Sequence, residues 1–277
     1  MSIGTNSRAA RWTVNGLLLA GAVFTLLPLL WMFSVSFMQP GEASHNPPPL
    51  WPAHATLANY RELFERAGMG RYLFNSFLIA SAITLCSLAF NLSAGYAFAK
   101  LHFAGRERWF QIVLAALLIP LQVAMMPLFL LMKWLHLVNS YGGVIVPALA
   151  TALGIYLVRQ YTRSIPDELI EAARIDGAGE WTIFLRIVLP LLKPMIITLA
   201  VLTFLASWND FMWPLIVLSD QTWQTAPVAL AGLSREHVQD NELMMAGSVV
   251  TILPVLLLFL VLQRQYLQGL LLGSVKG

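Results

Sequence analysis

The chain has 277 residues and a formal net charge of +3, and it is 58% hydrophobic but only 11% charged, with a mean hydropathy of +0.69. One soluble core cannot hide so much apolar side chain, so the composition excludes a soluble globular protein and predicts an all-α membrane protein. No run of Lys and Arg with interleaved aromatic residues indicates a nucleic-acid surface.

Six apolar runs are long enough to cross the membrane, which takes about 20 residues of helix. They cover residues 13–38, 72–99, 109–132, 141–158, 191–218 and 243–262. The first run follows Arg8 and Arg11 and is longer than the apolar part of a signal peptide, so we predict a retained anchor. With the N-terminus inside, twelve of the 17 Lys and Arg lie in inner segments, which predicts that both termini are cytoplasmic.

Two outer segments are long enough to meet a soluble partner or simply to cap the bundle. Residues 39–71 contain Leu57, Tyr60 and Phe64 on one helical face, which predicts a short helix at the outer surface. Residues 219–242 are largely polar, and Trp223 is the expected interface anchor there. Both interpretations of these segments stay open.

A charged segment, residues 171–194, stands between the fourth and fifth predicted spans. Ser164 followed by Asp167 resembles a capping box, with Pro166 in the first turn, so a helix should begin there and end at Gly177. A second short helix is predicted from an apolar stripe at helical spacing, formed by Trp181, Phe184, Leu185 and Val188. The pair is either a docking element or an amphipathic connector on the membrane surface.

The charged segment resembles the signature of the permease subunits of ATP-binding-cassette importers that work with a periplasmic binding protein. That signature is Glu-Ala-Ala, three residues and Gly, and it stands as residues 171–177. The longer form of the carbohydrate importers continues through Asp176-Gly177-Ala178, Phe184, Leu189-Pro190-Leu191 and Lys193-Pro194. Further matches are Asn59-Tyr60, Asn75-Ser76, residues 94–98 before 103–106, residues 208–215 and the tail 268–277.

The resemblance, to the smaller permease of maltose-type importers, implies a type I fold of six transmembrane helices with a cytoplasmic coupling helix. It implies an N-terminal anchor and periplasmic loop over residues 1–71, a core over 72–266 and a cytoplasmic tail over 267–277. The implied ATPase-coupling residues are Glu171, Ala172, Ala173, Asp176, Gly177 and Ala178, with Glu171 pairing with a basic residue of the ATPase. Gly95 is a departure, because many relatives have Ala there.

The resemblance also implies the partners. They are a second permease in a heterodimer, two ATP-binding cassette subunits, and a periplasmic or lipid-anchored sugar-binding protein, assembled at the bacterial inner membrane. The chain has no phosphate-binding loop, since Ala, Met, Leu and Val precede its lysines Lys100, Lys133, Lys193 and Lys276. ATP and Mg are therefore expected on the ATPase subunits, and this chain is expected to have no catalytic residue and no cofactor.

Other classes of function fit the sequence less well. The five histidines include no pair at the spacing of helical metal ligands, and no nucleophile motif occurs, so a membrane hydrolase is a remote alternative and no metal site is expected. A transporter driven by an ion gradient is the stronger alternative, because it also needs a polytopic bundle. Charges near the membrane midplane and two related halves would indicate it, and neither is evident.

Candidates for the substrate pathway are polar residues in the spans. They are Thr84 and Asn91 in the second span, Gln122 in the third, and Ser207, Asn209 and Asp210 in the fifth, with Tyr96, Trp208 and Trp213 offering apolar rings to a sugar. The competing interpretation is that Ser and Thr join helices at close contacts, and we favour it for the second span. Pro120 and Pro127, on either side of Gln122, are also expected to bend the third span.

Overall fold

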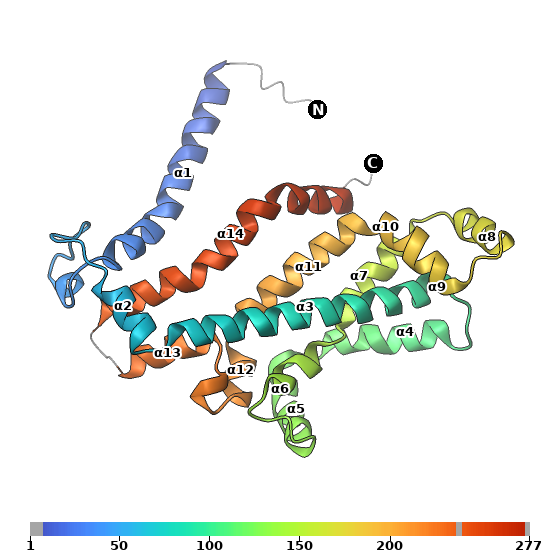
Figure 1. Cartoon of the computed structure of the whole chain (residues 1–277). Coiled ribbons are helices and arrows are strands. Elements are labelled where there is room, and N and C mark those ends of the chain that lie inside the picture. The colour runs from blue at the N-terminus through green and yellow to red at the C-terminus, as the bar shows by residue number, and fades with distance from the viewer. Residues whose placement is uncertain (1–7, 237–239, 275–277) are drawn as a thin grey trace. The chain divides into compact units, whose positions relative to one another are not determined.

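The computed structural model describes residues 8–236 and 240–274, and every regular element in them is a helix (Figure 1). Four helices in this part of the chain are long and apolar enough to cross a membrane: Arg11–Val35, Met69–Lys100, Tyr141–Arg163 and Asn241–Val261. Two bent helix pairs raise the number to six if each pair is one span. These elements correspond in order to the six predicted spans.

The chain divides into two compact units. The first comprises residues up to Gly70 together with Leu230–Pro254, and it contains α1 (Arg8–Val35), the 3-10 turn Glu42–Ser44 and α2 (Ala58–Glu65). The second comprises Arg71–Ala229 and the residues from Val255. Its helices are α4 (Arg106–Ala115), α5 (Leu121–Trp134), α6 (Tyr141–Ile145), α7 (Ala152–Arg163), α8 (Asp167–Ile175), α9 (Glu180–Ile183), α10 (Leu189–Leu191), α11 (Lys193–Trp208) and α12 (Met212–Val217). Three helices contribute to both units: α3 (Met69–Lys100), α13 (Ala226–Glu236) and α14 (Asn241–Ser274).

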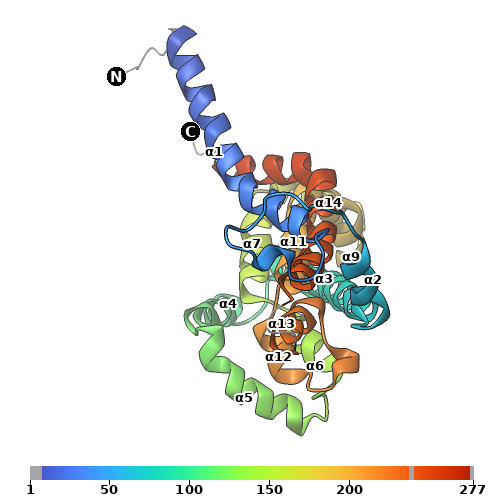
Figure 2. The same ribbon diagram turned by 90° about the vertical axis from the view of Figure 1, so that its left-hand side faces the viewer.

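The third predicted span is broken rather than continuous. α4 passes into a 3-10 turn, Ala116–Leu118, and the segment Arg106–Leu118 meets α5 at 107°. Figure 2 shows α5 running in a different direction from α4. Ile119 and Pro120 have extended backbone conformations. A proline disfavours the helical conformation of the residue before it, so the break falls at this pair, and Pro127 remains inside α5.

The fifth predicted span, residues 191–218, is also interrupted. α11 ends at Trp208, and α12 begins four residues later at Met212. Asn209 is the C-cap residue of α11, and both its amide and its side-chain Nδ2 donate to the carbonyl of Leu205, at 3.1 and 2.9 Å. At the other end of α11, the helical segment Glu180–Leu191 meets it at 79°. The predicted tail begins inside α14, and its residues 275–277 lie outside the described part of the chain.

In the first unit, the predicted short helix exists but buries a different face. Leu63 and Asn59 are its buried residues, whereas Leu57 is 66% exposed. The Asn59 side chain donates hydrogen bonds to the carbonyls of Ser36 and Met38, at 3.0 and 2.8 Å. The side-chain amide of Asn59 therefore fixes the chain that leaves α1. The periodicity of apolar residues does not predict this buried polar contact.

In the second unit, Trp223 packs against protein. Its ring meets that of Tyr141 edge-on at 4.7 Å, and Asn75 of α3 donates to the carbonyls on either side, those of Thr222 and Gln224, at 3.0 and 2.8 Å. Within the predicted outer segment 219–242, residues 237–239 lie outside the described part of the chain.

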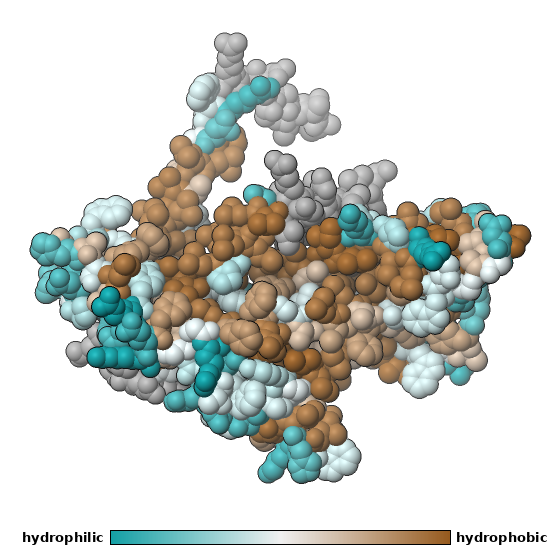
Figure 3. Space-filling view, in the orientation of Figure 1, coloured by the Kyte–Doolittle hydropathy of each residue, from teal (hydrophilic) through white to brown (hydrophobic). Residues whose placement is uncertain are grey.

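Two buried clusters hold the second unit together. One contains Ile79, Ile83, Met125, Met132, Val144, Trp213, Val217 and Leu218. The other, here called the α8-side core, contains Leu92, Tyr96, Val158, Ile165, Ile170, Ile183, Phe184, Val188, Leu192 and Leu199. Apolar surface covers α3 and α11, and polar residues gather where the chain forms α8 and α9 (Figure 3).

Gly95 brings α3 close to α7. A Cβ at this position would lie 2.5 Å from Cγ1 of Val158 and 3.0 Å from the backbone nitrogen of Arg159. The close packing of α3 against α7 therefore requires glycine at position 95.

Candidate functional site

The candidate site is the exposed helix α8 with the turn that follows it. Its N-terminus is not formed as predicted: Ser164 closes α7 instead, because its Oγ donates to the carbonyl of Tyr161 at 2.7 Å. Pro166 is the N-cap residue of α8 and offers no side-chain cap, and Asp167 and Glu168 occupy the first turn. Carboxylates are favoured at that end of a helix dipole, so charge takes the place of a capping box.

The two faces of α8 differ sharply in burial. Ile170 is 2% exposed and Ala173 packs with it against the α8-side core. Ala172 and Glu171 are exposed, and Ile175 is 86% exposed. The two adjacent alanines therefore have different surroundings: Ala173 lies on the core side, and Ala172 belongs to a face that is free to contact a partner.

A Schellman motif ends the helix. The amide of Ala178 donates to the carbonyl of Ala173 at 2.9 Å, and the amide of Gly177 donates to that of Arg174 at 3.0 Å, while Asp176 is the C-cap. Gly177 has φ +83°, and a Cβ there would meet nothing within 4 Å. Glycine is needed for its backbone conformation and not for space, as the sequence predicts.

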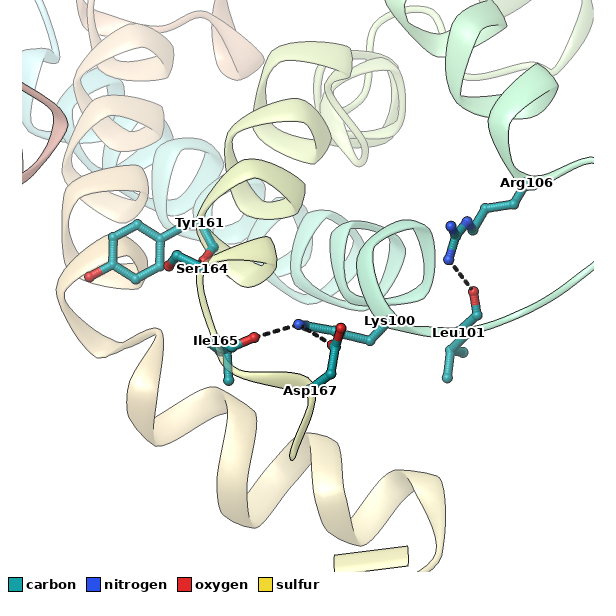
Figure 4. Close-up of polar contacts among 7 residues, drawn as sticks. All are labelled: Lys100, Leu101, Arg106, Tyr161, Ser164, Ile165 and Asp167. Carbon is teal, nitrogen blue, oxygen red and sulfur yellow. Dashed lines mark hydrogen bonds and ion pairs between the residues drawn. The ribbon is translucent and has the colours of Figure 1, made fainter. Parts of the chain in front are cut away.

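The N-terminal end of α8 is tied to the end of α3 (Figure 4). The Lys100 side chain is 5% exposed, and its Nζ donates to Oδ1 of Asp167 at 2.6 Å and to the carbonyl of Ile165 at 2.5 Å. This hydrogen bond and charge lower the pKa of the Asp167 carboxyl. The buried ammonium thus holds the start of α8 through two hydrogen bonds.

The C-terminal end of α8 is tied to the same helix. Arg174 Nε donates to Oε1 of Glu180 at 2.7 Å, and the hydroxyl of Tyr96 donates to Oε2 at 2.9 Å. The hydrogen bond to Glu180 raises the pKa of Arg174. Because Tyr96 and Lys100 are four residues apart, one turn of α3 holds both ends of α8.

Sequence reasoning did not find this arrangement. The sequence suggested that the Tyr96 ring could contact a sugar. Tyr96 is only 4% exposed, and its ring packs on that of Phe184 with the centroids 5.1 Å apart. Trp208 and Trp213, proposed for the same role, are 2% and 6% exposed. The available signal was that Tyr96 and Lys100 lie one turn apart where α3 meets the charged segment.

The second short helix is real, but its predicted stripe is divided. Phe184 and Val188 are buried, whereas Trp181 and Leu185 are 70% and 54% exposed. Residues Phe184–Val188 form a π turn, whose wider winding shifts the helix face, so that Ile183 and Leu192 complete the buried set. The exposed Trp181 and Leu185 add apolar surface beyond α8.

In the second span, the pathway candidates Thr84 and Asn91 are buried. Thr84 Oγ1 donates to the carbonyl of Ala80 at 2.7 Å. Asn91 Oδ1 accepts from the amide of Thr151 at 3.0 Å, and its Nδ2 donates to the hydroxyl oxygens of Ser87 and Thr151 at 2.8 and 3.2 Å. These contacts favour the helix-packing interpretation for Asn91, and a role in the pathway stays a prediction.

The other pathway candidates are more accessible. Gln122 is exposed at the start of α5, Ser207 and Asp210 are half-buried, and Asn209 is exposed. Asp210 Oδ1 accepts from the amide of Trp213 in the first turn of α12 at 3.4 Å, and Phe211 is the N-cap residue of this helix. Within residues 8–236 and 240–274, no cluster of three or more His, Cys, Asp or Glu is arranged to hold a metal ion.

Comparison with known proteins gives one consistent result. Residues 91–268 match the family described as "Binding-protein-dependent transport system inner membrane component". The chain is 41% identical over 259 residues to the arabinooligosaccharides transport system permease protein AraQ of Halalkalibacterium halodurans, covering 92% of this chain and 93% of the relative. It is 32% identical over 263 residues to the sn-glycerol-3-phosphate transport system permease protein UgpE of Yersinia enterocolitica, with 92% and 93% covered.

A solved structure has the same architecture. A chain of a bacterial ABC transporter involved in the import of the acidic polysaccharide alginate superposes with a TM-score of 0.82 at 25% identity, covering 93% of this chain and 98% of that one. The likeness confirms the predicted all-α polytopic fold of the importer permeases.

Proposed function

Because the chain belongs to the family of binding-protein-dependent transport system inner membrane components, we propose that it is a permease subunit of an ATP-driven sugar importer, coupled through α8. It is a multi-pass inner-membrane protein of a family of permease subunits, which are not the ATPases. The proposed cargo is an oligosaccharide or disaccharide. The relative named for arabinooligosaccharides is 41% identical to this chain, whereas the one named for sn-glycerol-3-phosphate is 32% identical. The higher identity to the arabinooligosaccharide permease supports a sugar as the cargo.

One observation carries the coupling role: α8 presents an exposed face on a helix whose two ends are anchored to the same membrane span. The exposed Ile175 and Leu169 offer apolar contacts, and Glu171 offers a charge for a basic residue of an ATPase subunit. The ties through Lys100 and Glu180 make α8 and the end of α3 one rigid part. Closure of an ATPase dimer against α8 would then move α3 as a rigid body.

The assembly we propose contains this chain, a second permease, two ATP-binding cassette subunits that bind ATP and Mg, and a sugar-binding protein on the outer side. The coupling segment and both termini are on the cytoplasmic side in this arrangement. Family membership supports a binding protein as partner, since that dependence is part of the family's description.

The test is purification of the tagged chain in mild detergent, followed by mass spectrometry of retained proteins and assay of ATP hydrolysis. We expect a retained ATPase, and we expect Ile175→Ser to lose it because this residue is 86% exposed on the proposed contact face. Leu50→Ser is the control, since Leu50 is also exposed, at 69%, on the outer loop. Sugar uptake by the chain alone in ATP-free vesicles would refute the proposal and favour an ion-driven transporter.

A further inference from the structure

A polar cleft of about 620 Å³ lies beside α8 and shares Glu171 with the proposed contact with the ATPase. The ends of α3, α4 and α7 form its walls together with residues of α8. Five basic residues line it: Lys100, Arg106, Arg159, Arg163 and Arg174. The lining carboxylates are Glu107, Asp167 and Glu171, so the cleft carries an excess of two positive charges without counting His102.

Three of the basic residues already have carboxylate partners. Lys100 is paired with Asp167, Arg174 with Glu180, and Arg159 with Glu107 at 2.7 Å. Arg159 is buried at 5% exposure and also lies over the ring of Phe110, with its guanidinium 3.7 Å from the ring centroid. These three ion pairs hold the lining side chains in place, and their charges are balanced.

The other two arginines are available to a ligand. Arg106 donates one hydrogen bond, from Nη1 to the carbonyl of Leu101 at 3.0 Å, and Arg163 is exposed. Among the described residues, no carboxylate lies within 4.0 Å of either guanidinium, so both have unused N–H donors. A guanidinium group can donate two parallel hydrogen bonds to the oxygens of a phosphate group.

The depth of the cleft distinguishes the kinds of anion that can reach it. Lys100 and Arg163 are the last residues of two membrane spans, and Arg106 is the first residue of a third. Such positions lie at the level of the lipid headgroups. Trp109, one turn beyond Arg106, is 59% exposed, as expected of an aromatic residue at the membrane interface.

We propose that this cleft binds the phosphate-bearing headgroup of an anionic lipid, with Arg106 and Arg163 holding the phosphate. The inference rests on the proposed function in one respect, the cytoplasmic location of α8. That location places the cleft at the leaflet that is rich in anionic lipid. Glu171 opposes an anion, but it interacts with Arg174 and lies on the exposed face of α8. A bound headgroup would bridge the ends of α4 and α7 next to the coupling helix.

The test uses the purified complex in detergent, titrated with phosphatidylglycerol or with phosphatidylcholine of the same acyl chains and followed by native mass spectrometry. We expect preferential binding of phosphatidylglycerol, weakened about fivefold for each arginine replaced in Arg106→Gln and Arg163→Gln. Arg108→Gln is the matched control, because Arg108 is exposed two residues from Arg106 and does not line the cleft. A thermal melt of each variant checks that it folds.

Three outcomes would overturn the proposal. The first is equal binding of both lipids, or equal loss in the Arg108→Gln control. The second is displacement of the lipid by millimolar inorganic phosphate, which would identify a soluble anion as the ligand. The third is binding by the permease alone that vanishes when the ATPase is retained, which would assign the cleft to that subunit. Retention of the ATPase reports on the proposed function independently.

Discussion

At the scale of single residues, Gly177 and Asn91 show two ways in which one side chain determines local structure. Gly177 is required because the turn after α8 needs a positive φ, and empty space surrounds the place where its Cβ would be. Asn91 is required because it pairs with the backbone and hydroxyl of Thr151 at the start of α7. Gly177 is thus constrained by backbone conformation, and Asn91 by the packing of α3 against the start of α7.

We expect Gly177→Val to weaken retention of the ATPase about five- to thirtyfold. An L residue in the left-handed region costs about 1–2 kcal/mol, and a β-branched one resists it most. Gly179→Val is the control, since Gly179 has φ −72° and its Cβ would also meet nothing within 4 Å. The ratio of sugar uptake to ATP hydrolysis in proteoliposomes measures coupling. Unchanged coupled uptake in Gly177→Val would contradict the proposed role of the turn.

Asn91→Leu is expected to lower the free energy of unfolding by about 1–3 kcal/mol, because it removes the hydrogen bonds that the buried Asn91 side chain makes with Ser87 and Thr151. Thermal melting in detergent measures the loss. Ser93→Ala should have little effect, since the Ser93 hydroxyl bonds only to a carbonyl of its own helix, that of Ala89. A fully stable Asn91→Leu protein that fails to transport would instead assign this residue to the pathway.

At the scale of elements, one turn of α3 controls the position of α8. Lys100 holds the start of α8 and Tyr96, through Glu180, holds its end. The sequence predicts both short helices and the turn between them, because alanines, charges and Gly177 are local signals. It does not predict the anchors, because they join residues that are 67 and 84 positions apart.

We expect Tyr96→Phe to loosen α8 while leaving the α8-side core intact. The substitution keeps the ring contact with Phe184 and removes only the hydroxyl that bonds to Glu180. Hydrogen exchange should become faster in Asp167–Ile175, by about five- to tenfold for the loss of one hydrogen bond of about 1 kcal/mol. Tyr156→Phe is the control, since the Tyr156 ring stacks on Phe110.

A double-mutant cycle with Glu180→Gln assigns the effect of Tyr96→Phe to the pair. Additive changes in the exchange rates would show that Tyr96 and Glu180 act separately, and the anchor described here would then be wrong. A shared effect, smaller in the double variant than the sum of the two singles, supports it.

The broken spans mark the limit of what apolar runs reveal. Hydropathy locates the six segments, and Pro120 correctly predicts the bend in the third, but the bend after Leu191 depends on backbone conformation and packing. The π turn at Phe184–Val188 has no simple sequence signature, which is why the predicted stripe included the exposed Trp181 and Leu185.

At the scale of the whole molecule, the order of the spans and the family are evident from the sequence, whereas the polar contacts that organise each unit are not. Asn59 fixes the loop of the first unit, and Asn75 fixes the loop around Trp223 in the second. Both are asparagines inside or beside apolar runs, where a periodicity analysis counts them only as interruptions.

The pH dependence of stability follows from the Lys100–Asp167 pair. Since the pKa of Asp167 is lowered in the folded protein, its stabilising contribution is complete above the unfolded pKa and is lost as the pH falls through the lower, folded value. We therefore expect no change from this pair between pH 8 and 5 and a loss only below about pH 4. Melting curves of the protein and of Asp167→Asn across this range measure it. A difference between the two that disappears already at pH 6 would show that the pair is not formed.

Gly95 has a consequence for how this chain tolerates exchange with its relatives. A methyl group there would overlap Val158, so Ala at position 95 demands either a smaller residue at 158 or a wider crossing of α3 and α7. Tyr96, next to Gly95 on α3, holds Glu180, and Arg159, next to Val158 on α7, lines the polar cleft beside α8. A chimera that borrows only one of the two helices would thus inherit a mismatch at the crossing, and the two helices are best grafted as a pair.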